Sequence, residues 1–220
     1  MTFRSEERDG AELLTLDIPP LNTLEIEAVR ALEAHFTTRP ADRPLLLTGS
    51  GRAFSAGVDV KAFTSYSETE RDAFFKAITR MVAALCATKA PVVAALNGHA
   101  MGGGFVLALC ADYRIAVEDG AKFGLTEAAA GVPFPAGPVE VVAAEIPAAL
   151  RRHMTLTSAV IPAATLREHL VFDEIAPADG LLERAETRLR ALAAQPAFAA
   201  VKAQTRGPLI RRLSELAAER

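Results

Sequence analysis

The stretch from residue 91 to residue 116 reads PVVAALNGHAMGGGFVLALCADYRIA, and the fold prediction starts from it. Its apolar run at 92–96 ends in Asn97-Gly98, which is the pattern of a buried strand followed by a turn. Three adjacent glycines at 102–104 then precede a second apolar run, at 105–110, which we expect to form a helix or a strand. This succession of short apolar runs and glycine-rich turns is typical of an α/β protein.

Similar patterns extend on both sides of this stretch. Short apolar runs predict strands at 12–17, 45–48, 91–96 and 113–117. Apolar residues at helical spacing predict helices at 23–36 and 68–88, and Ser67-Glu68-Thr69-Glu70 is a plausible cap of the second helix. The last third predicts helices broken at Pro162, Pro177, Pro196 and Pro208. We therefore expect a single domain over 1–220, with its α/β core over about 1–150 and a helical region over about 151–220.

Composition narrows the classes of function. The net charge is −3 and no basic stripe is present, so we expect neither nucleic acid nor an anionic membrane as a partner. No apolar stretch reaches membrane-spanning length, and the first residues lack the apolar core of a secretion signal, which predicts a soluble, cytoplasmic protein. Cys86 and Cys110 lie in apolar runs, so we expect buried free thiols. The histidines lack metal-ligand spacing, and we predict no metal.

Two glycine-rich loops are the candidate chemical features. If the run after the glycines at 102–104 is a helix, each glycine in its first turn costs up to ~1 kcal/mol relative to alanine. One explanation is that free backbone N–H groups approach an oxyanion there, and the other is tight packing of backbone against backbone. The loop at 51–61 also has small residues and follows a buried strand, although it equally suits an ordinary strand-to-helix connection. Together, the two loops favour an oxyanion hole.

Four segments carry a resemblance to a known family. They are RAFSAGVD at 52–59, PVVAALNGHAMGGG at 91–104, ADYRIA at 111–116 and FGLTE at 123–127. In order and spacing they resemble the crotonase family of enoyl-CoA hydratases and isomerases, and a weaker similarity extends from Leu13 to about Arg206. The resemblance implies repeated ββα units with C-terminal helices, and a homotrimer or a dimer of trimers. It also implies an acyl-CoA substrate of fatty acid metabolism, with coenzyme A as part of that substrate and no separate cofactor.

The resemblance also assigns roles to individual residues. It implies that the backbone N–H groups of Val58 and Gly103 form the oxyanion hole. The residues that it places along the substrate are Ser55, Ala56, Asp59, Lys61, Gly102, Val106, Phe134 and Pro135. Other basic residues that suit the phosphates of coenzyme A are Lys89, Lys202, Arg211 and Arg212, although each is also a typical surface charge.

The outcome of the reaction depends on carboxyl groups. The typical hydratase of this family uses two glutamates, and this sequence has Val106 at one of the two positions and Glu127 at the other. Valine cannot transfer a proton, so the resemblance favours an enoyl-CoA isomerase with Glu127 as its base. A base at neutral pH needs a raised pKa, for which Val106, Val132 and Phe134 are a suitable apolar surround. Glu127 also has a purely structural interpretation as the start of a helix.

Two other functions remain open at this stage. Glu140 is a possible second carboxylate, although a solvated helix position is its commoner interpretation, so a hydratase that uses Glu140 or a bound water is the runner-up. The third candidate is an inactive homologue that binds acyl-CoA. It is compatible with Val106 and with a C-terminal region in which little sequence follows Pro208.

Overall fold

The structure is a computed structural model that describes residues 2–118 and 120–219. Its main sheet has the strand order β1-β2-β4-β7-β9-β12. β1 is antiparallel to β2, and all other neighbours in this sheet are parallel. The bounds of these strands are β1 Phe3–Arg8, β2 Ala11–Leu16, β4 Leu45–Gly49, β7 Val92–Leu96, β9 Tyr113–Val117 and β12 Glu174–Ala176.

Shorter strands form a second layer beside the main sheet. One small sheet has the order β11-β10-β8-β5, and β3 pairs with β6 in a two-stranded sheet. The bounds of these strands are β3 Thr23–Leu24, β5 Ala53–Ser55, β6 Gly57–Val58, β8 His99–Met101, β10 Phe123–Gly124 and β11 Val160–Ile161.

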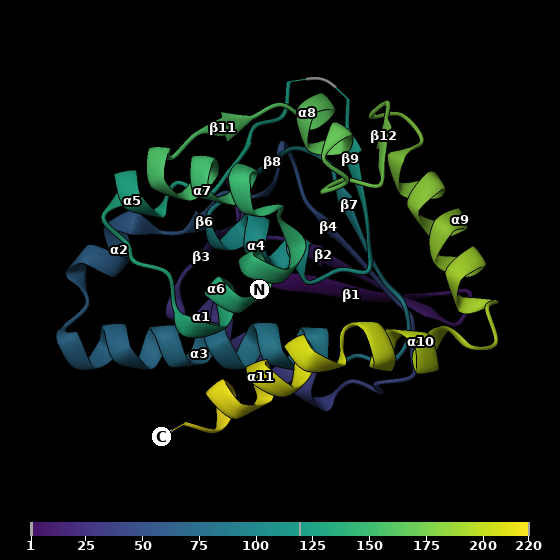
Figure 1. Cartoon of the computed structure of the whole chain (residues 1–220), viewed down its shortest axis with the longest axis horizontal. Helices are drawn as coiled ribbons and strands as arrows, with labels where there is room; N and C mark the ends of the chain where they lie inside the picture. The colour runs from purple at the N-terminus through teal and green to yellow at the C-terminus, as the bar shows by residue number, and fades with distance from the viewer. Residues whose placement is uncertain (1, 119, 220) are drawn as a thin grey trace.

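Helices surround both layers (Figure 1). Those of the first half are α1 Ile26–Thr38, α2 Val60–Ser65, α3 Glu68–Cys86, α4 Gly103–Leu109 and α5 Glu127–Ala130. Those of the second half are α6 Ala136–Glu145, α7 Ala148–Thr157, α8 Ala163–Glu168, α9 Leu181–Ala193, α10 Phe198–Thr205 and α11 Gly207–Ala218. The long helix α3 crosses the lower part of Figure 1, and α9 lies at its right-hand side.

The chain repeats one ββα unit. After β4, β7 and β9 of the main sheet, it adds β5, β8 and β10 to the small sheet. A helix follows β8 and β10 directly, and it follows β5 after the short strand β6. This arrangement confirms the predicted α/β class with a ββα core. Because the repeats are parallel, the small strands and the first turns of the following helices gather at one edge of the main sheet.

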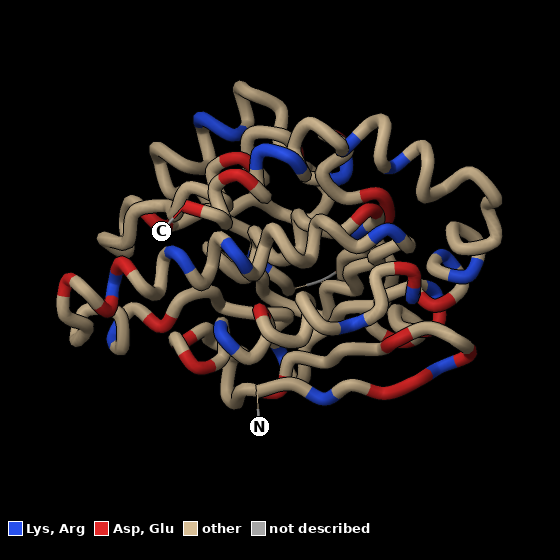
Figure 2. The backbone as a smooth tube through the Cα atoms, turned by 90° about the horizontal axis from the view of Figure 1, so that it is seen from below, with Lys and Arg blue, Asp and Glu red and all other residues tan. Residues whose placement is uncertain are grey.

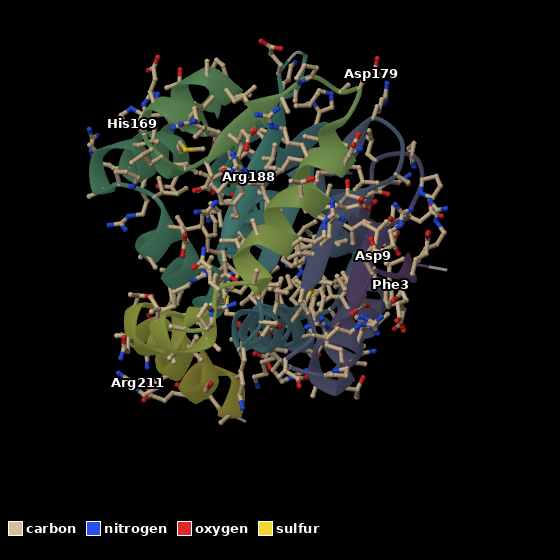
Figure 3. All side chains as sticks on the ribbon, turned by 90° about the vertical axis from the view of Figure 1, so that its right-hand side faces the viewer. Phe3, Asp9, His169, Asp179, Arg188 and Arg211 are labelled. Atoms are coloured by element: carbon tan, nitrogen blue, oxygen red, sulfur yellow. The ribbon has the colours of Figure 1, made fainter. Side chains whose placement is uncertain are left out.

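Both faces of the main sheet are buried. Alternate residues of its strands, such as Leu14 and Leu47, face the core that α1, α3 and α4 cover. Their neighbours, such as Leu13 and Leu46, form a second cluster with apolar residues of α9. Figure 3 looks onto α9, which carries Arg188 and lies across the strands. Coverage on both sides explains why the central strands read as continuous apolar runs.

Most of the predicted elements are present. The helix predicted at 68–88 is α3, and its capping box at Ser67 and Glu70 is confirmed. The run at 105–110 belongs to helix α4, which settles the choice between helix and strand. The helix predicted at 23–36 begins later, at Ile26, because Thr23–Leu24 pairs with β6 as strand β3.

The last third differs from its prediction as a purely helical region. Strand β12 pairs with β9 in the main sheet, and β11 pairs with β10 in the small one. Strands of two or three residues form because a partner strand is already in place, and a local pattern does not reveal that partner. Pro208 lies in the first turn of α11, where proline is compatible with a helix, and α11 packs on α3 and α6.

Four features of the described structure relate to the composition of the chain. Both cysteines are free and buried, as predicted. Figure 2 shows acidic and basic residues interspersed along the backbone. Over residues 2–118 and 120–219, no helix has the length and hydropathy needed to cross a membrane. The same residues contain no group of three or more His, Cys, Asp or Glu placed to hold a metal ion.

A buried charge network attaches α10 to the core. The Asp112 carboxylate accepts from Lys202 Nζ at 2.6 Å and from Arg206 at 2.8 Å. Arg206 also donates to Glu145, which accepts from Arg114 as well. Lys202 was a candidate for a coenzyme A phosphate, and this expectation is wrong, because its ammonium group is buried against Asp112. Burial lowers the pKa of Lys202, whereas Asp112 favours its charged form.

We expect the substitution Asp112→Ala to destabilise the protein by about 3–5 kcal/mol, because it leaves buried cations without their partner. The carboxylate also accepts from the Val92 N–H, so the start of β7 loses a hydrogen bond too. Urea denaturation measures this change in the free energy of unfolding. Asp72→Ala is the matched control, since its ion pair with Lys76 is exposed and is worth less than about 1 kcal/mol. Equal effects of the two substitutions would contradict a structural role for the network.

Candidate active site

Two backbone segments approach each other closely where β6 meets the start of α4. A Cβ atom added at Gly57 would lie 2.4 Å from Met101 O and 3.1 Å from Gly103 N. A Cβ added at Gly103 would lie 3.9 Å from Val58 N. The N–H groups of Val58 and Gly103, which the sequence suggested as a pair, therefore lie beside the same small space.

The pairing of the strands leaves both of these N–H groups available. In the parallel pair β3–β6, Leu24 O accepts from Asp59 N. Because successive N–H groups of a strand point to opposite sides, the N–H of Val58, the residue before Asp59, points away from β3. Gly103 is the first residue of α4, and the first N–H groups of a helix have no partner within the helix. Both donors can therefore meet an oxyanion, and the positive end of the α4 dipole lies at the same place.

The surroundings of the three adjacent glycines differ, so the reason for having glycine differs from one position to the next. Gly102 has φ +49°, which favours glycine, and a Cβ there would lie 3.3 Å from Glu127 Oε1. At Gly103 a Cβ would meet its nearest atom only at 3.6 Å, so packing does not require glycine there. At Gly104 it would lie 2.4 Å from Ser55 O. Close packing therefore explains Gly104, whereas at Gly103 an added Cβ would be in ordinary van der Waals contact and packing leaves the explanation open.

Glu127 lies next to this space. It is the first residue of α5, and its Oε1 faces Gly102. The residue is only 9% exposed, and Oε2 has no hydrogen-bond partner within the described part of the chain. Burial raises the pKa of Glu127 from its ordinary value of 4.5 to about 7. Its carboxyl group can therefore both accept and release a proton near neutral pH.

A pocket of about 820 Å³ opens beside Glu127, within the size range of small-molecule sites. Val132 and Phe134, which we expected near Glu127, line it, whereas Val106 lies in the core beneath. The other residues of its wall are Ala128, Gly131, Pro133, Val139, Val142, Ala143, Arg151, Arg152, Thr155 and Leu156. Apart from Glu127, two arginines and one threonine, the wall is apolar, and so it suits a molecule with an apolar part.

Most of the other predicted substrate residues shape the loop before α2. The Ser55 hydroxyl donates to Asn22 O at 2.6 Å and accepts from Gly57 N at 3.2 Å. Asp59 is the N-cap of α2, and its carboxylate accepts from Ala62 N. Ala56 N donates to Leu21 O, again within the protein. The side chains of Ser55 and Asp59 thus hold the loop that presents the Val58 N–H.

The remaining predicted residues lie in three different places. Lys61 is exposed on α2, and Pro135 is the half-buried N-cap of α6. Glu140 lies on α6, where its carboxylate accepts from Arg212 of α11 at 3.3 Å. Glu140 does not line the pocket that Glu127 lines. The structure therefore does not bring the possible second carboxylate together with the first.

Sequence reasoning missed Asn22. Its side-chain N–H₂ group donates to the carbonyls of Ala53 and Phe54, and its Oδ1 accepts from Ile18 N. Asn22 has φ +54°, which asparagine tolerates better than most residues, and its position just after Pro19-Pro20 was the available signal. Sequence reasoning also missed Arg151 and Arg152, because nothing in the local sequence of α7 indicates that this helix borders the pocket.

The fold and the site together define a protein that can hold an oxyanion between two backbone N–H groups beside one buried carboxyl group. Comparisons identify the family. A profile of the enoyl-CoA hydratase/isomerase family matches residues 6–218. A (7aS)-7a-methyl-1,5-dioxo-2,3,5,6,7,7a-hexahydro-1H-indene-carboxyl-CoA hydrolase of Mycobacterium tuberculosis is 34% identical over 197 residues, which cover 84% of this chain and 75% of that protein. A carnitinyl-CoA dehydratase of Salmonella arizonae is 34% identical over 209 residues, covering 90% and 78%.

Solved structures agree with this assignment. A probable enoyl-CoA hydratase, ECHA3, of Mycobacterium tuberculosis has a TM-score of 0.88 at 26% identity, covering 99% of this chain and 93% of that one. A second structure of the same Mycobacterium tuberculosis protein, named there as an apo enoyl-CoA isomerase, has a TM-score of 0.86 at 25% identity, covering 98% and 96%. The chain therefore belongs to the enoyl-CoA hydratase/isomerase family, also called the crotonase family, and is an acyl-CoA enzyme of that family. The names of its relatives include hydratase, dehydratase, isomerase and hydrolase, so they leave the reaction open.

We expect Gly103→Ala to fold normally and to lose roughly 10²–10³-fold in turnover of an acyl-CoA substrate, because its methyl group would lie 3.9 Å from Val58 N and crowd an oxyanion beside the two donors. Thermal unfolding and steady-state kinetics measure the two properties. Gly104→Ala is the matched control, and we expect it to impair folding instead, because its Cβ overlaps Ser55. An active Gly103→Ala variant would argue against an oxyanion at this place.

We expect Glu127→Gln to stabilise the protein increasingly as the pH rises from about 4.5 to about 7. In this range the folded wild type retains a proton that the unfolded chain has released, because burial raises the folded-state pKa to about 7. Wild-type stability therefore falls with rising pH, by a total of about 3 kcal/mol for this group. Urea denaturation of both proteins across this range measures the difference. A pH-independent difference would mean that Glu127 ionises normally.

Proposed function

We propose that the protein converts a 3-enoyl-CoA into the corresponding 2-enoyl-CoA. In the proposed reaction, the thioester oxygen lies between the N–H groups of Val58 and Gly103, and Glu127 removes a proton from C2. The negative charge of the resulting dienolate is carried by the oxygen, to which each well-placed donor can contribute about 2.7–4 kcal/mol. Glu127 then returns the proton to C4, so one carboxyl group serves both steps and no other reactant is consumed.

The single observation that carries this proposal is the isolation of the Glu127 carboxyl group. Among the described residues that line the pocket, it is the only carboxyl group. Val106 occupies the position where the family's hydratases have a second glutamate, and Glu140 is paired with Arg212. An addition of water needs one group to activate the water and another to protonate the substrate, whereas a proton shift needs only one.

The surroundings of Glu127 also suit this reaction. A base that gives back the proton it has taken works best with a pKa near the pH of the reaction, and burial raises the pKa of Glu127 to about 7. The apolar wall of the pocket, which includes Val132 and Phe134, has a chemistry that suits an acyl chain.

Hydration is the second candidate, because relatives that match 90% of this chain are named as a carnitinyl-CoA dehydratase and as a probable enoyl-CoA hydratase of Mycobacterium bovis. In that reaction a bound water, or Glu140 after a rearrangement, would take the place of the missing glutamate. One relative is named as a hydrolase, and another is named as a probable hydratase in one structure and as an isomerase in a second, so the reactions named within this family differ widely.

The proposal predicts that the protein converts 3-hexenoyl-CoA into 2-hexenoyl-CoA, and that 2-hexenoyl-CoA is not hydrated. Chromatography of the thioesters after incubation with each substrate measures both reactions. Glu127→Gln should lower the isomerisation rate by about 10²–10⁴-fold, since it removes the proposed base. Glu140→Gln, a control at an ion-paired position, should retain the activity of the wild type.

Three results would contradict the proposal in different ways. Formation of 3-hydroxyhexanoyl-CoA without isomerisation would favour a hydratase, and a large loss in Glu140→Gln would show that Glu140 takes part. Tight binding of several acyl-CoA thioesters without any turnover would favour an inactive homologue.

A further inference from the structure

The helix that carries Glu127 receives its capping bond from a distant part of the chain. Helix α5 has only four residues, Glu127–Ala130, and a helix so short depends on groups outside it. Thr126, its own N-cap, makes no side-chain capping bond. Instead, the Ala129 N–H donates to the hydroxyl of Ser158 at 3.1 Å. One of the unpaired N–H groups at the start of α5 is thus satisfied by the connection between α7 and β11.

Ser158 has a backbone conformation that serine adopts rarely. It is the C-cap of α7, with φ +53° and ψ 34°. Glycine adopts this left-handed conformation without strain, and asparagine also tolerates it. Glycine is therefore the simpler residue for the backbone at this place, but it lacks a side-chain acceptor. The presence of a serine there, with its hydroxyl bound to α5, indicates that the side chain has a role.

The segment that contains Ser158 is also linked, through β10, to the turn that precedes the Gly103 donor. Val160 of β11 pairs with Gly124 of β10, and Gly124 O accepts from Gly102 N at 2.8 Å. A Cβ added at Gly124 would lie 3.2 Å from Ala159 O, so the two segments are in close contact. The same connection is therefore joined to the turn at Gly102 through β10, and to the helix of Glu127 through Ser158.

We propose that Ser158 is a positioning residue, whose hydroxyl holds α5 so that the Glu127 carboxyl group stays over Gly102 and beside the oxyanion donors. This inference rests on the proposed function, in which Glu127 exchanges protons with the substrate. Ser158 itself does not contact the substrate in this proposal. Without its hydroxyl, the first turn of α5 loosens and the carboxyl group leaves its aligned position, which slows proton transfer more than it weakens binding.

Two substitutions separate the hydroxyl from the backbone conformation. Ser158→Gly keeps the left-handed backbone and removes the acceptor, whereas Ser158→Asn tolerates the same backbone and supplies an amide oxygen as acceptor. In Ser158→Gly we expect faster hydrogen exchange of the Ala129 amide. We also expect kcat for 3-hexenoyl-CoA to fall roughly tenfold with little change in KM, since a misplaced catalytic group can lower the rate by up to about a hundredfold. In Ser158→Asn we expect both kcat and the protection of the amide to recover.

A pH profile provides a further measurement. If α5 loosens, Glu127 becomes more solvated and its pKa falls, so the rise of kcat/KM with pH should move to lower pH in Ser158→Gly. The side chains of Val132 and Phe134 are the neighbours in the pocket, and Arg151 and Arg152 of α7 are the charged groups that line it. A role in general stability alone would lower the melting temperature without moving this profile.

The outcomes separate this inference from the proposed function. Wild-type kcat, or unchanged exchange of the Ala129 amide, in Ser158→Gly would overturn the role of Ser158 while Glu127→Gln still shows the loss expected of the base. An Ser158→Asn variant with a protected Ala129 amide and the low kcat of Ser158→Gly would overturn it as well. Absence of turnover in the wild type would overturn the proposed function, and with it the role of Ser158 in catalysis.

Discussion

The site depends on the close approach of two backbone segments, Gly57-Val58 and Met101–Gly104, which their glycines make possible. A side chain at Gly57 would collide with Met101 O, and one at Gly104 would collide with Ser55. These contacts bring an N–H group of a strand and an N–H group of a helix start to the same space. Since neither donor belongs to a side chain, the arrangement is as rigid as the backbone on both sides, which is what electrostatic preorganisation requires.

Burial has two opposing effects at this place. It raises the pKa of Glu127 to about 7, which prepares the carboxyl group for proton transfer but destabilises the folded state wherever the group is ionised. Oε2 of Glu127 also destabilises the folded state, because a buried polar atom without a partner in the described chain costs stability unless a ligand satisfies it. A loss of stability of this kind is common at functional sites, because the arrangement that activity needs is often not the most stable one.

The rest of the fold offsets this cost and keeps the site in place. The main sheet is buried on both faces, and the ion pairs of Asp112 and Glu145 fix α10 to the core. Asn22 ties the loop before Val58 to the end of β2 through bonds to three carbonyls and one N–H group. Ser158 does the equivalent for α5. Buried polar groups with several partners thus support the elements on which the donors and Glu127 lie.

The sequence by itself determined the alternation of strands and helices, the glycine run and the presence of Val106 where the resemblance expects a second glutamate, because these features are local or depend on motif order. Only the tertiary structure decided which glycine is needed for packing and which could carry a Cβ atom, since the answer depends on Ser55 and Val58. It also decided that Lys202 is buried and that Glu140 faces Arg212. Charged residues look alike in a sequence whether they are solvated or paired, and only contacts between distant segments distinguish the two. The short strands β11 and β12 and the role of Asn22 escaped prediction for the same reason, because their partners lie far away along the chain.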